Sequence, residues 1–208
     1  AGGLDFQGLC RLMTSIRAVI LGDELLTAAG DPQGIGWLGR VQARLPAASD
    51  ISMFPLPMIG ETSSDLLDRF KSEALPRFSD QSENKLILCL GSSDIAAGLT
   101  ISRSRLNLAT VLDDAIREGI SVFVIGPTPT GVPEFDAEVN HLSDGFADVV
   151  KRRQLTYVDC FSPLVEHEGW LKELTESSRR LPGQVGYGLI AWLVMNRGWF
   201  EFLGREEN

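Results

Sequence analysis

The chain has 208 residues, of which 44% are hydrophobic and 23% are charged. A globular chain of this length buries roughly 70% of its unfolded surface, which is enough for one sizeable core, so one α/β domain is the default expectation. The formal net charge of −9, from 19 Lys and Arg against 28 Asp and Glu, leaves no basic face to displace counterions and therefore excludes nucleic acid as a partner.

The cysteines and the hydropathy pattern indicate the compartment. Cys10, Cys89 and Cys160 leave an odd thiol under any pairing. Because Cys89 and Cys160 lie in or beside apolar runs, we expect both to be buried thiols in a reducing compartment. No apolar run approaches the roughly eighteen residues that a spanning helix needs. We therefore expect no membrane partner, and the cytoplasm is the expected location.

No metal or cofactor is expected. No two cysteines have the spacing of metal ligands. Residues 34–39 read as Gly-x-Gly-x-x-Gly, but the pattern does not directly follow a strand, as a dinucleotide site requires.

The predicted elements indicate the fold. In chain order they are a strand at 16–21, a helix at 36–45, a weaker strand at 51–54, a helix beginning at 62–65, a strand at 85–90, a helix at 106–117, a strand at 122–125, a helix at 134–153, a short strand at 156–159 and a helix at 186–202. Short strands that alternate with helices indicate a parallel sheet covered on both faces. We predict an α/β fold, a three-layer α/β/α sandwich around a mostly parallel, flavodoxin-like sheet of five strands.

The domain is expected to occupy residues 15–204. Residues 1–14 lack the basic start of a signal peptide and are expected to be a leader, either disordered or not native to the chain. Residues 205–208 are expected to be a tail. Ligands of such sheets bind at the carboxyl ends of the strands, so the segments that follow the strands are the functional candidates.

Four of these segments resemble the blocks of SGNH (GDSL-type) hydrolases. Residues 19–25 (VILGDEL) are similar to the first block, a strand that runs into Gly-Asp-Ser-Leu. Residues 59–62 (IGET) and 90–94 (LGSSD) are similar to the second block and to the third, Gly-x-Asn-Asp. Residues 182–187 (PGQVGY) resemble the end of the fifth block, where Asp-x-x-His-Pro precedes a Gly-Tyr pair. The resemblance implies the SGNH-hydrolase fold and the activity of an ester or acyl hydrolase.

The departures from this pattern fall on the catalytic positions. Glu24 takes the place of the nucleophilic serine, Leu181 that of the histidine and Ser178 that of the aspartate. Ser93 stands at the asparagine position. Acyl transfer by serine needs an activated hydroxyl and a base within hydrogen-bond reach, and loss of either costs about 10⁶ in turnover. The usual serine mechanism is therefore predicted to be absent.

Other positions match the blocks or offer polar groups. The resemblance implies a backbone oxyanion donor at Gly60 and loop-ordering acids at Asp94 and Asp23. Ser93 and Thr62 are candidate ligand-binding hydroxyls, although Thr62 also suits the first position of a helix.

The remaining polar candidates lie later in the chain. Of the two histidines, His141 is expected on a helix surface, whereas His167 follows the last strand and is a candidate for a relocated base. Arg179 and Arg180 are expected to be solvated, or to meet an anionic ligand or the acids of the cleft.

Three functions remain open. The first is a pseudo-hydrolase that keeps a cleft for a small acyl-like or ester-like ligand. The second is an ester hydrolase without a serine nucleophile, in which Glu24 and Asp94 act as base or hold a cation such as Mg²⁺. The third is an interaction protein, with a homo-oligomer among the options, whose working surface is the aromatic stripe of the last helix. That stripe comprises Trp192, Trp199, Phe200 and Phe202.

Overall fold

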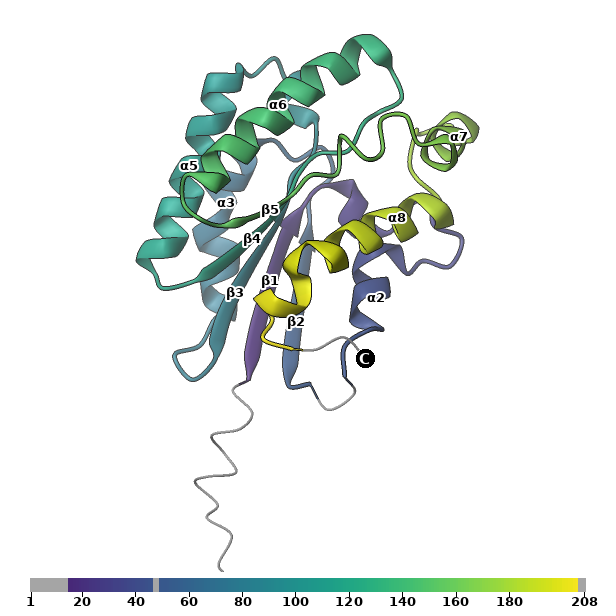
Figure 1. Cartoon of the computed structure of the whole chain (residues 1–208). Helices are drawn as coiled ribbons and strands as arrows, with labels where there is room; N and C mark the ends of the chain where they lie inside the picture. The colour runs from purple at the N-terminus through teal and green to yellow at the C-terminus, as the bar shows by residue number, and fades with distance from the viewer. Residues whose placement is uncertain (1–14, 47–48, 206–208) are drawn as a thin grey trace, which may run out of the picture.

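The five apolar runs that were expected as strands pair into one sheet, and every pairing is parallel. The computed structural model describes residues 15–46 and 49–205, and the sheet lies between two layers of helices within one domain (Figure 1). The predicted α/β fold is therefore confirmed. The expected leader at 1–14 and residues 206–208 of the expected tail lie outside the described residues.

The strand order is β2-β1-β3-β4-β5. The bounds are Ile16–Gly22 for β1, Ile51–Pro57 for β2, Glu83–Cys89 for β3, Ser121–Ile125 for β4 and Thr156–Val158 for β5. The chain moves from β1 outward to β2 and then returns to β3 on the other side of β1. This reversal opens a crevice at the carboxyl ends of β1 and β3, where flavodoxin-like sheets bind their ligands.

Strand β2 extends further than its sequence pattern indicated, to Pro57 rather than residue 54. Its two prolines, Pro55 and Pro57, weaken the pattern because proline cannot donate to a ladder. Strand β2 pairs only with β1 and forms an edge of the sheet, where proline is tolerated. The edge position explains why this strand was the hardest to predict.

The alternation of side chains along β1 builds two cores. Ile16, Ala18 and Ile20 belong to the core on one face of the sheet, and Val19 and Leu21 belong to the core on the other. All five are buried. A strand that is covered on both faces reads as a continuous apolar run, which is the signal that the sequence carried.

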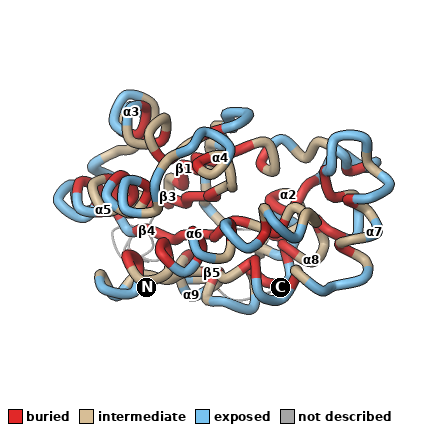
Figure 2. The backbone as a smooth tube through the Cα atoms, turned by 90° about the horizontal axis from the view of Figure 1, so that it is seen from above, coloured by how far each residue is buried: buried red, intermediate tan, exposed pale blue. Residues whose placement is uncertain are grey.

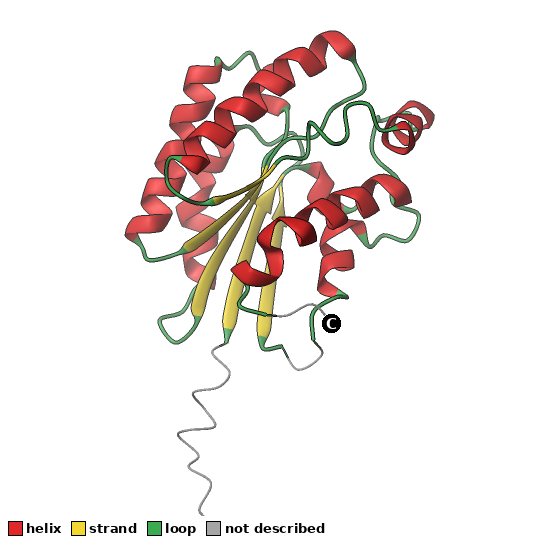
Figure 3. Cartoon of the chain, in the orientation of Figure 1, coloured by secondary structure: helices red, strands yellow, loops and turns green. Residues whose placement is uncertain are grey.

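The helices divide between the two faces, as Figures 2 and 3 show. Helices α2 (Gly36–Gln42) and α8 (Gln184–Val194) pack on the first core. Helices α3 (Ser63–Ala74), α5 (Ile101–Arg117) and α6 (Pro133–Lys151) pack on the second. In the part of the chain that the structure describes, no helix is both long and apolar enough to cross a membrane.

Short elements at the carboxyl end of the sheet were not predicted. They are the 3-10 helix η1 (Glu24–Thr27), helix α4 (Ser93–Ala96) and helix α7 (Glu168–Glu176). Another 3-10 turn, η2 (Leu75–Arg77), extends α3. Helices η1 and α4 are too brief to show a hydrophobic period, which needs a window of roughly 11–18 residues.

The prediction of one continuous helix at 186–202 is wrong. Helix α8 ends at Val194, the backbone leaves the helical region at Arg197 and Gly198, and a separate turn, α9 (Phe200–Phe202), follows. Gly198 adopts φ +91°, a conformation that glycine reaches at no steric cost.

The break separates the aromatic residues that were expected to form one stripe. Trp199 is fully buried and meets Trp37 and Phe123 edge-on, with ring centroids 6.4 Å and 5.6 Å away. Trp192 is 58% exposed. Only Trp192 of these two is available to a partner.

We predict that Trp199→Ala lowers the free energy of unfolding by about 3–5 kcal/mol, since it removes a buried aromatic side chain and leaves a cavity. Trp192→Ala is the matched control and should change stability by no more than about 0.5 kcal/mol. Urea unfolding followed by circular dichroism measures both. Equal losses in the two variants would contradict the packing described above.

Candidate functional site

A cleft of about 250 Å³ opens at the carboxyl ends of β1 and β3. Its lining comes from the segments that follow β1, β3 and β4, from α7, and from the turn that precedes α8. The lining residues are Asp23, Glu24, Leu25, Gly91, Ser92, Thr128, Pro129, Thr130, Trp170, Leu174, Arg179, Arg180, Leu181 and Pro182. The position is the one that the strand order predicts.

Two glycines allow the ends of β1 and β3 to approach each other, and one of them, Gly91, lines the cleft. A Cβ on Gly22 would lie 2.7 Å from the Cβ of Cys89. A Cβ on Gly91 would lie 2.2 Å from Oδ2 of Asp23. Both contacts are shorter than any side chain tolerates, so glycine is required at each position for the Asp23 carboxyl to lie over β3.

Asp23 is a buried acid with a perturbed pKa. Its Oδ1 accepts a hydrogen bond from the Leu25 backbone N–H at 3.0 Å, which caps η1. Burial, followed by the negative charge of the neighbouring Glu24, raises the pKa of Asp23 to about 7. Burial disfavours the ionised form because the carboxylate loses its hydration. Asp23 therefore titrates near neutral pH.

Glu24 holds the backbone donor of the second block. Its Oε2 accepts a hydrogen bond from the Gly60 N–H at 3.0 Å. Gly60 lies in the exposed turn after β2 with φ +72°, which directs its N–H toward η1. The turn is fixed by a buried ion pair in which Arg69 Nε donates to Glu61 Oε1 at 2.5 Å.

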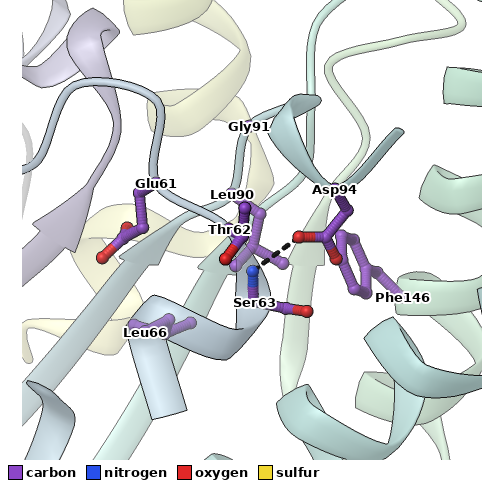
Figure 4. Close-up of a pocket in the computed structure, with 8 residues that line it drawn as sticks. All are labelled: Glu61, Thr62, Ser63, Leu66, Leu90, Gly91, Asp94 and Phe146. Atoms are coloured by element: carbon purple, nitrogen blue, oxygen red, sulfur yellow. Dashed lines mark hydrogen bonds between the residues drawn. The ribbon is translucent and has the colours of Figure 1, made fainter. Parts of the chain in front are cut away.

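Asp94 lies in a different cavity. Its Oδ1 accepts a hydrogen bond from the Ser63 N–H at 2.6 Å, at the start of α3 (Figure 4). The side chain is 2% exposed, and its Oδ2 has no partner among the described residues. The cavity beside it measures about 10 Å³ and shares Gly91 with the cleft. Glu24 and Asp94 therefore do not line the same space.

Neither candidate hydroxyl, that of Thr62 or that of Ser93, lines the cleft. Thr62 caps α3: its Oγ1 accepts from the Asp65 N–H at 3.2 Å and donates to the Asp65 carboxylate at 2.6 Å. Ser93 is the first residue of α4 and is not among the cleft-lining residues. Its neighbour Ser92 lines the cleft instead.

Leu181 closes one wall of the cleft with a buried side chain. Its backbone N–H donates to Ser177 Oγ at 3.1 Å. Ser178 is exposed and is absent from the lining. The wall is fixed further along by Glu173, whose carboxylate accepts hydrogen bonds from the Gly183 and Gly186 N–H groups at 2.8 Å and 2.7 Å.

Arg179 and Arg180 form the lip of the cleft and are both exposed. Neither makes a side-chain hydrogen bond or an ion pair with another residue of the described ranges, 15–46 and 49–205. Arg180 has φ +50°, a backbone conformation that is uncommon for a residue with a side chain.

Neither histidine of the described chain lines the cleft. His141 is exposed on α6, as expected. His167 precedes α7 and its Nδ1 accepts a hydrogen bond from the Trp170 N–H at 3.4 Å. The imidazole lines a separate groove beside Leu189 and Trp192. Among the residues that the structure describes, no group of three or more Asp, Glu, His or Cys side chains is placed to hold a metal ion.

Several lining residues were missed in the sequence. Trp170 and Leu174 come from α7, which was not predicted, and Trp170 Nε1 donates to the Pro129 carbonyl at 3.1 Å. The sequence does not distinguish Ser92 from Ser93 as a cleft residue. The conformation of the backbone decides that Ser92 lines the cleft and Ser93 does not. For Glu173 the sequence offered no signal, since the N–H groups that donate to its carboxylate lie ten or more residues away.

The chain matches a known protein family in sequence and several solved structures in fold. The family model described as GDSL-like Lipase/Acylhydrolase matches residues 20–188. Among solved structures, the lipase/acylhydrolase from Enterococcus faecalis is 21% identical, with a TM-score of 0.69 over 90% of this chain and 96% of that one. TesA is 19% identical, with a TM-score of 0.69 over 88% and 97% of the two chains.

A catalytic mutant of Axe2, an acetylxylan esterase from Geobacillus stearothermophilus, is 13% identical, with a TM-score of 0.70 over 94% and 97% of the chains. At these identities the solved structures establish the fold. None of the curated protein sequences compared with the chain matches it.

We predict that Asp23→Asn changes the pH dependence of folding. The folded protein keeps the Asp23 proton up to about pH 7, whereas the unfolded chain releases it near 3.8. The contribution of Asp23 to stability is therefore complete at low pH and is lost as the pH rises through 7. An asparagine cannot ionise, so the variant should gain on the order of 2–4 kcal/mol relative to the wild type between about pH 4 and pH 8.

Urea unfolding at several pH values measures this difference. Asp113→Asn is the control, because Arg153 lowers the pKa of that exposed carboxylate and its removal should leave the decline with pH in place. A wild type and an Asp23→Asn variant with parallel pH profiles would show that Asp23 is ionised in the folded protein.

Proposed function

Because the chain belongs to the GDSL-like lipase/acylhydrolase family, we propose that it is a pseudo-hydrolase within it, one that keeps the cleft of the fold for a small ligand and has lost the serine mechanism. The cleft lies at the ligand-binding end of the sheet and retains free polar groups. The hydroxyls of Ser92 and Thr128 line it and make no hydrogen bond within the described residues.

The hydrogen bond from Gly60 to Glu24 is the observation that carries this proposal. A serine hydrolase keeps such a backbone N–H available for the oxyanion of the transition state. Here Glu24 Oε2 accepts from it at 3.0 Å. A substrate carbonyl would have to displace this carboxylate oxygen before it could accept from the same N–H. The donor is therefore already engaged in the resting protein.

The second support is the lack of a histidine base in the cleft. Leu181, in the place that the fifth block gives to histidine, presents an apolar side chain to the cleft. Both histidines lie outside the cleft: His141 is on α6, and His167 lines a separate groove. The Ser92 hydroxyl makes no hydrogen bond to a carboxylate or any other base within the described residues, so it lacks the contact that would activate it as a nucleophile.

The alternative of a carboxylate-based hydrolase has weaker support. It requires Glu24 and Asp94 to act on one substrate, yet they line different cavities on either side of Gly91. Glu24 alone remains in contact with the cleft. This alternative predicts ester cleavage that disappears in Glu24→Gln, and such a result would replace the pseudo-hydrolase proposal.

We predict that the wild-type protein is not labelled by a fluorophosphonate probe and does not turn over p-nitrophenyl acetate above background. Glu24→Ser alone should also remain unlabelled, because the new hydroxyl has no base. The triple variant Glu24→Ser, Ser178→Asp, Leu181→His should be labelled at residue 24, since a nucleophile and a base would then line the cleft, with an acid at the aligned position three residues before the base.

In-gel fluorescence and mass spectrometry of the labelled peptide provide the readout, and thermal melting shows that each variant is folded. Labelling of the wild type at Ser92 or Ser93 would overturn the proposal directly.

A second candidate function, self-association through α8, has one specific observation in its favour. The outer face of α8 exposes Val185 to 49% and Trp192 to 58%, and residues 184–196 contain no charged side chain. Copies of a chain with a net charge of −9 repel each other least across an uncharged surface. Gly188, with open space above it, would allow two helices to approach closely. The occupant that we propose for this face is a second copy of the chain.

We predict that Trp192→Ser shifts any dimer toward the monomer in analytical ultracentrifugation, with a loss of affinity of about tenfold or more. Leu106→Ser is the control, because Leu106 is equally exposed, at 57%, on the opposite layer of helices. A wild type that sediments as a monomer at all accessible concentrations would exclude this second function.

The cytoplasm remains our proposed location. Cys89 and Cys160 are free and buried, which is the state that a reducing compartment maintains.

A further inference from the structure

The cleft carries charges of both signs that do not neutralise each other. Asp23 and Glu24 line its floor, and Arg179 and Arg180 line its lip. Within the described residues, none of these four side chains forms an ion pair. The acids and the guanidinium groups therefore line a common space of about 250 Å³ without pairing across it.

This arrangement differs from that of the arginines in the framework. Arg40 pairs with Asp31, Arg69 with Glu61, and Arg153 with Asp113. These pairs hold loops and helices together. Arg179 and Arg180 have no such acid, although the chain has more acids than bases, so neither guanidinium serves the framework.

The turn that carries Arg180 is held in a fixed and uncommon conformation. The Arg180 N–H donates to the Ser177 carbonyl at 3.1 Å and sustains φ +50°. The side chain then extends over Gly131, where a Cβ would lie 3.8 Å from Arg180 Nη1. The exposed guanidinium therefore lies near Leu174, a cleft-lining residue, and beside Gly131, which lines a neighbouring groove.

The acid end has acceptor capacity left. Glu24 Oε2 binds the Gly60 N–H, while Glu24 Oε1 makes no hydrogen bond within the described residues. A donor on a ligand would complete the coordination of that oxygen. A positive donor would also favour ionised Asp23, whose proton is held near neutral pH by burial.

We propose that the cleft binds a small zwitterion of the amino acid or short peptide class, with its carboxylate at Arg179 and Arg180 and its ammonium at Glu24. Planar guanidinium groups suit a carboxylate because they donate two parallel hydrogen bonds to it. The volume of the cleft, about 250 Å³, lies below the roughly 300–1,000 Å³ of cavities for drug-sized ligands and favours a small molecule. This inference rests on the proposed function, since it takes the cleft to be a binding site.

The experiment measures binding to the full chain by isothermal titration calorimetry. The probes are glycine, glycylglycine and triglycine, which vary the separation of the two charges. The best of them is then compared with its C-terminal amide, which lacks the carboxylate, and with its N-acetyl derivative, which lacks the ammonium. We expect each modification to weaken binding by about tenfold or more.

Variants assign the two ends of the ligand. Arg179→Ala and Arg180→Ala should each weaken binding of the zwitterion and leave the weaker binding of its amide unchanged. Glu24→Gln should reduce the preference for the free ammonium over the N-acetyl form. Arg103→Ala is the matched control, because Arg103 is exposed on α5, outside the cleft lining, and carries the same charge.

No binding by any of the three probes at about 10 mM overturns the inference. Equal binding of the amide and the parent, or an equal loss in Arg103→Ala, does the same, because either would show that the lip arginines do not recognise the carboxylate. Failure of the proposed function has a different signature. It would appear as fluorophosphonate labelling or ester turnover in the same preparation, whatever the peptide titrations show.

Discussion

One hydrogen bond, from the Gly60 N–H to the Glu24 carboxylate at 3.0 Å, connects the first turn after β1 with the turn after β2. A buried backbone N–H needs a hydrogen-bond acceptor. In an acyl hydrolase, an oxyanion donor stabilises the negative charge that develops on the substrate oxygen in the transition state. Here a carboxylate oxygen of Glu24 already accepts from that N–H. Under the function we propose, a substrate oxygen would therefore gain little from this donor.

The same carboxylate affects its neighbour. Asp23 is buried over Gly91, and burial together with Glu24 raises its pKa to about 7. The hydrogen bond from the Leu25 N–H opposes this rise without cancelling it. The charge on the floor of the cleft consequently changes around neutral pH, whereas the guanidinium groups of Arg179 and Arg180 stay charged throughout. The balance between the two ends of the cleft is set by the protonation of Asp23.

The sequence was sufficient for the sheet because a strand covered on both faces is apolar throughout, as β1 and β3 are. The resemblance to the hydrolase blocks drew attention to Glu24 and Leu181, and both line the cleft. The sequence failed where tertiary contacts decide. Gly198 breaks the last helix so that Trp199 can enter the core, and no local pattern separates this glycine from those inside α8. Glu173 and Trp170 reach the site from α7, which only the folded chain brings near.

The contacts that shape the cleft do not depend on catalytic residues. Glu173 bonds the N–H groups at the start of α8, and the Tyr187 hydroxyl donates to the Ala29 carbonyl at 2.8 Å. Gly30 allows the loop after β1 to lie against Pro182, whose carbonyl would be 2.5 Å from a Cβ there. Since these groups hold the turn that contains Leu181, an apolar residue in place of a base leaves the turn and its arginines where they are. The loss of the serine mechanism that we propose is therefore compatible with a cleft that keeps its shape and its charged lip.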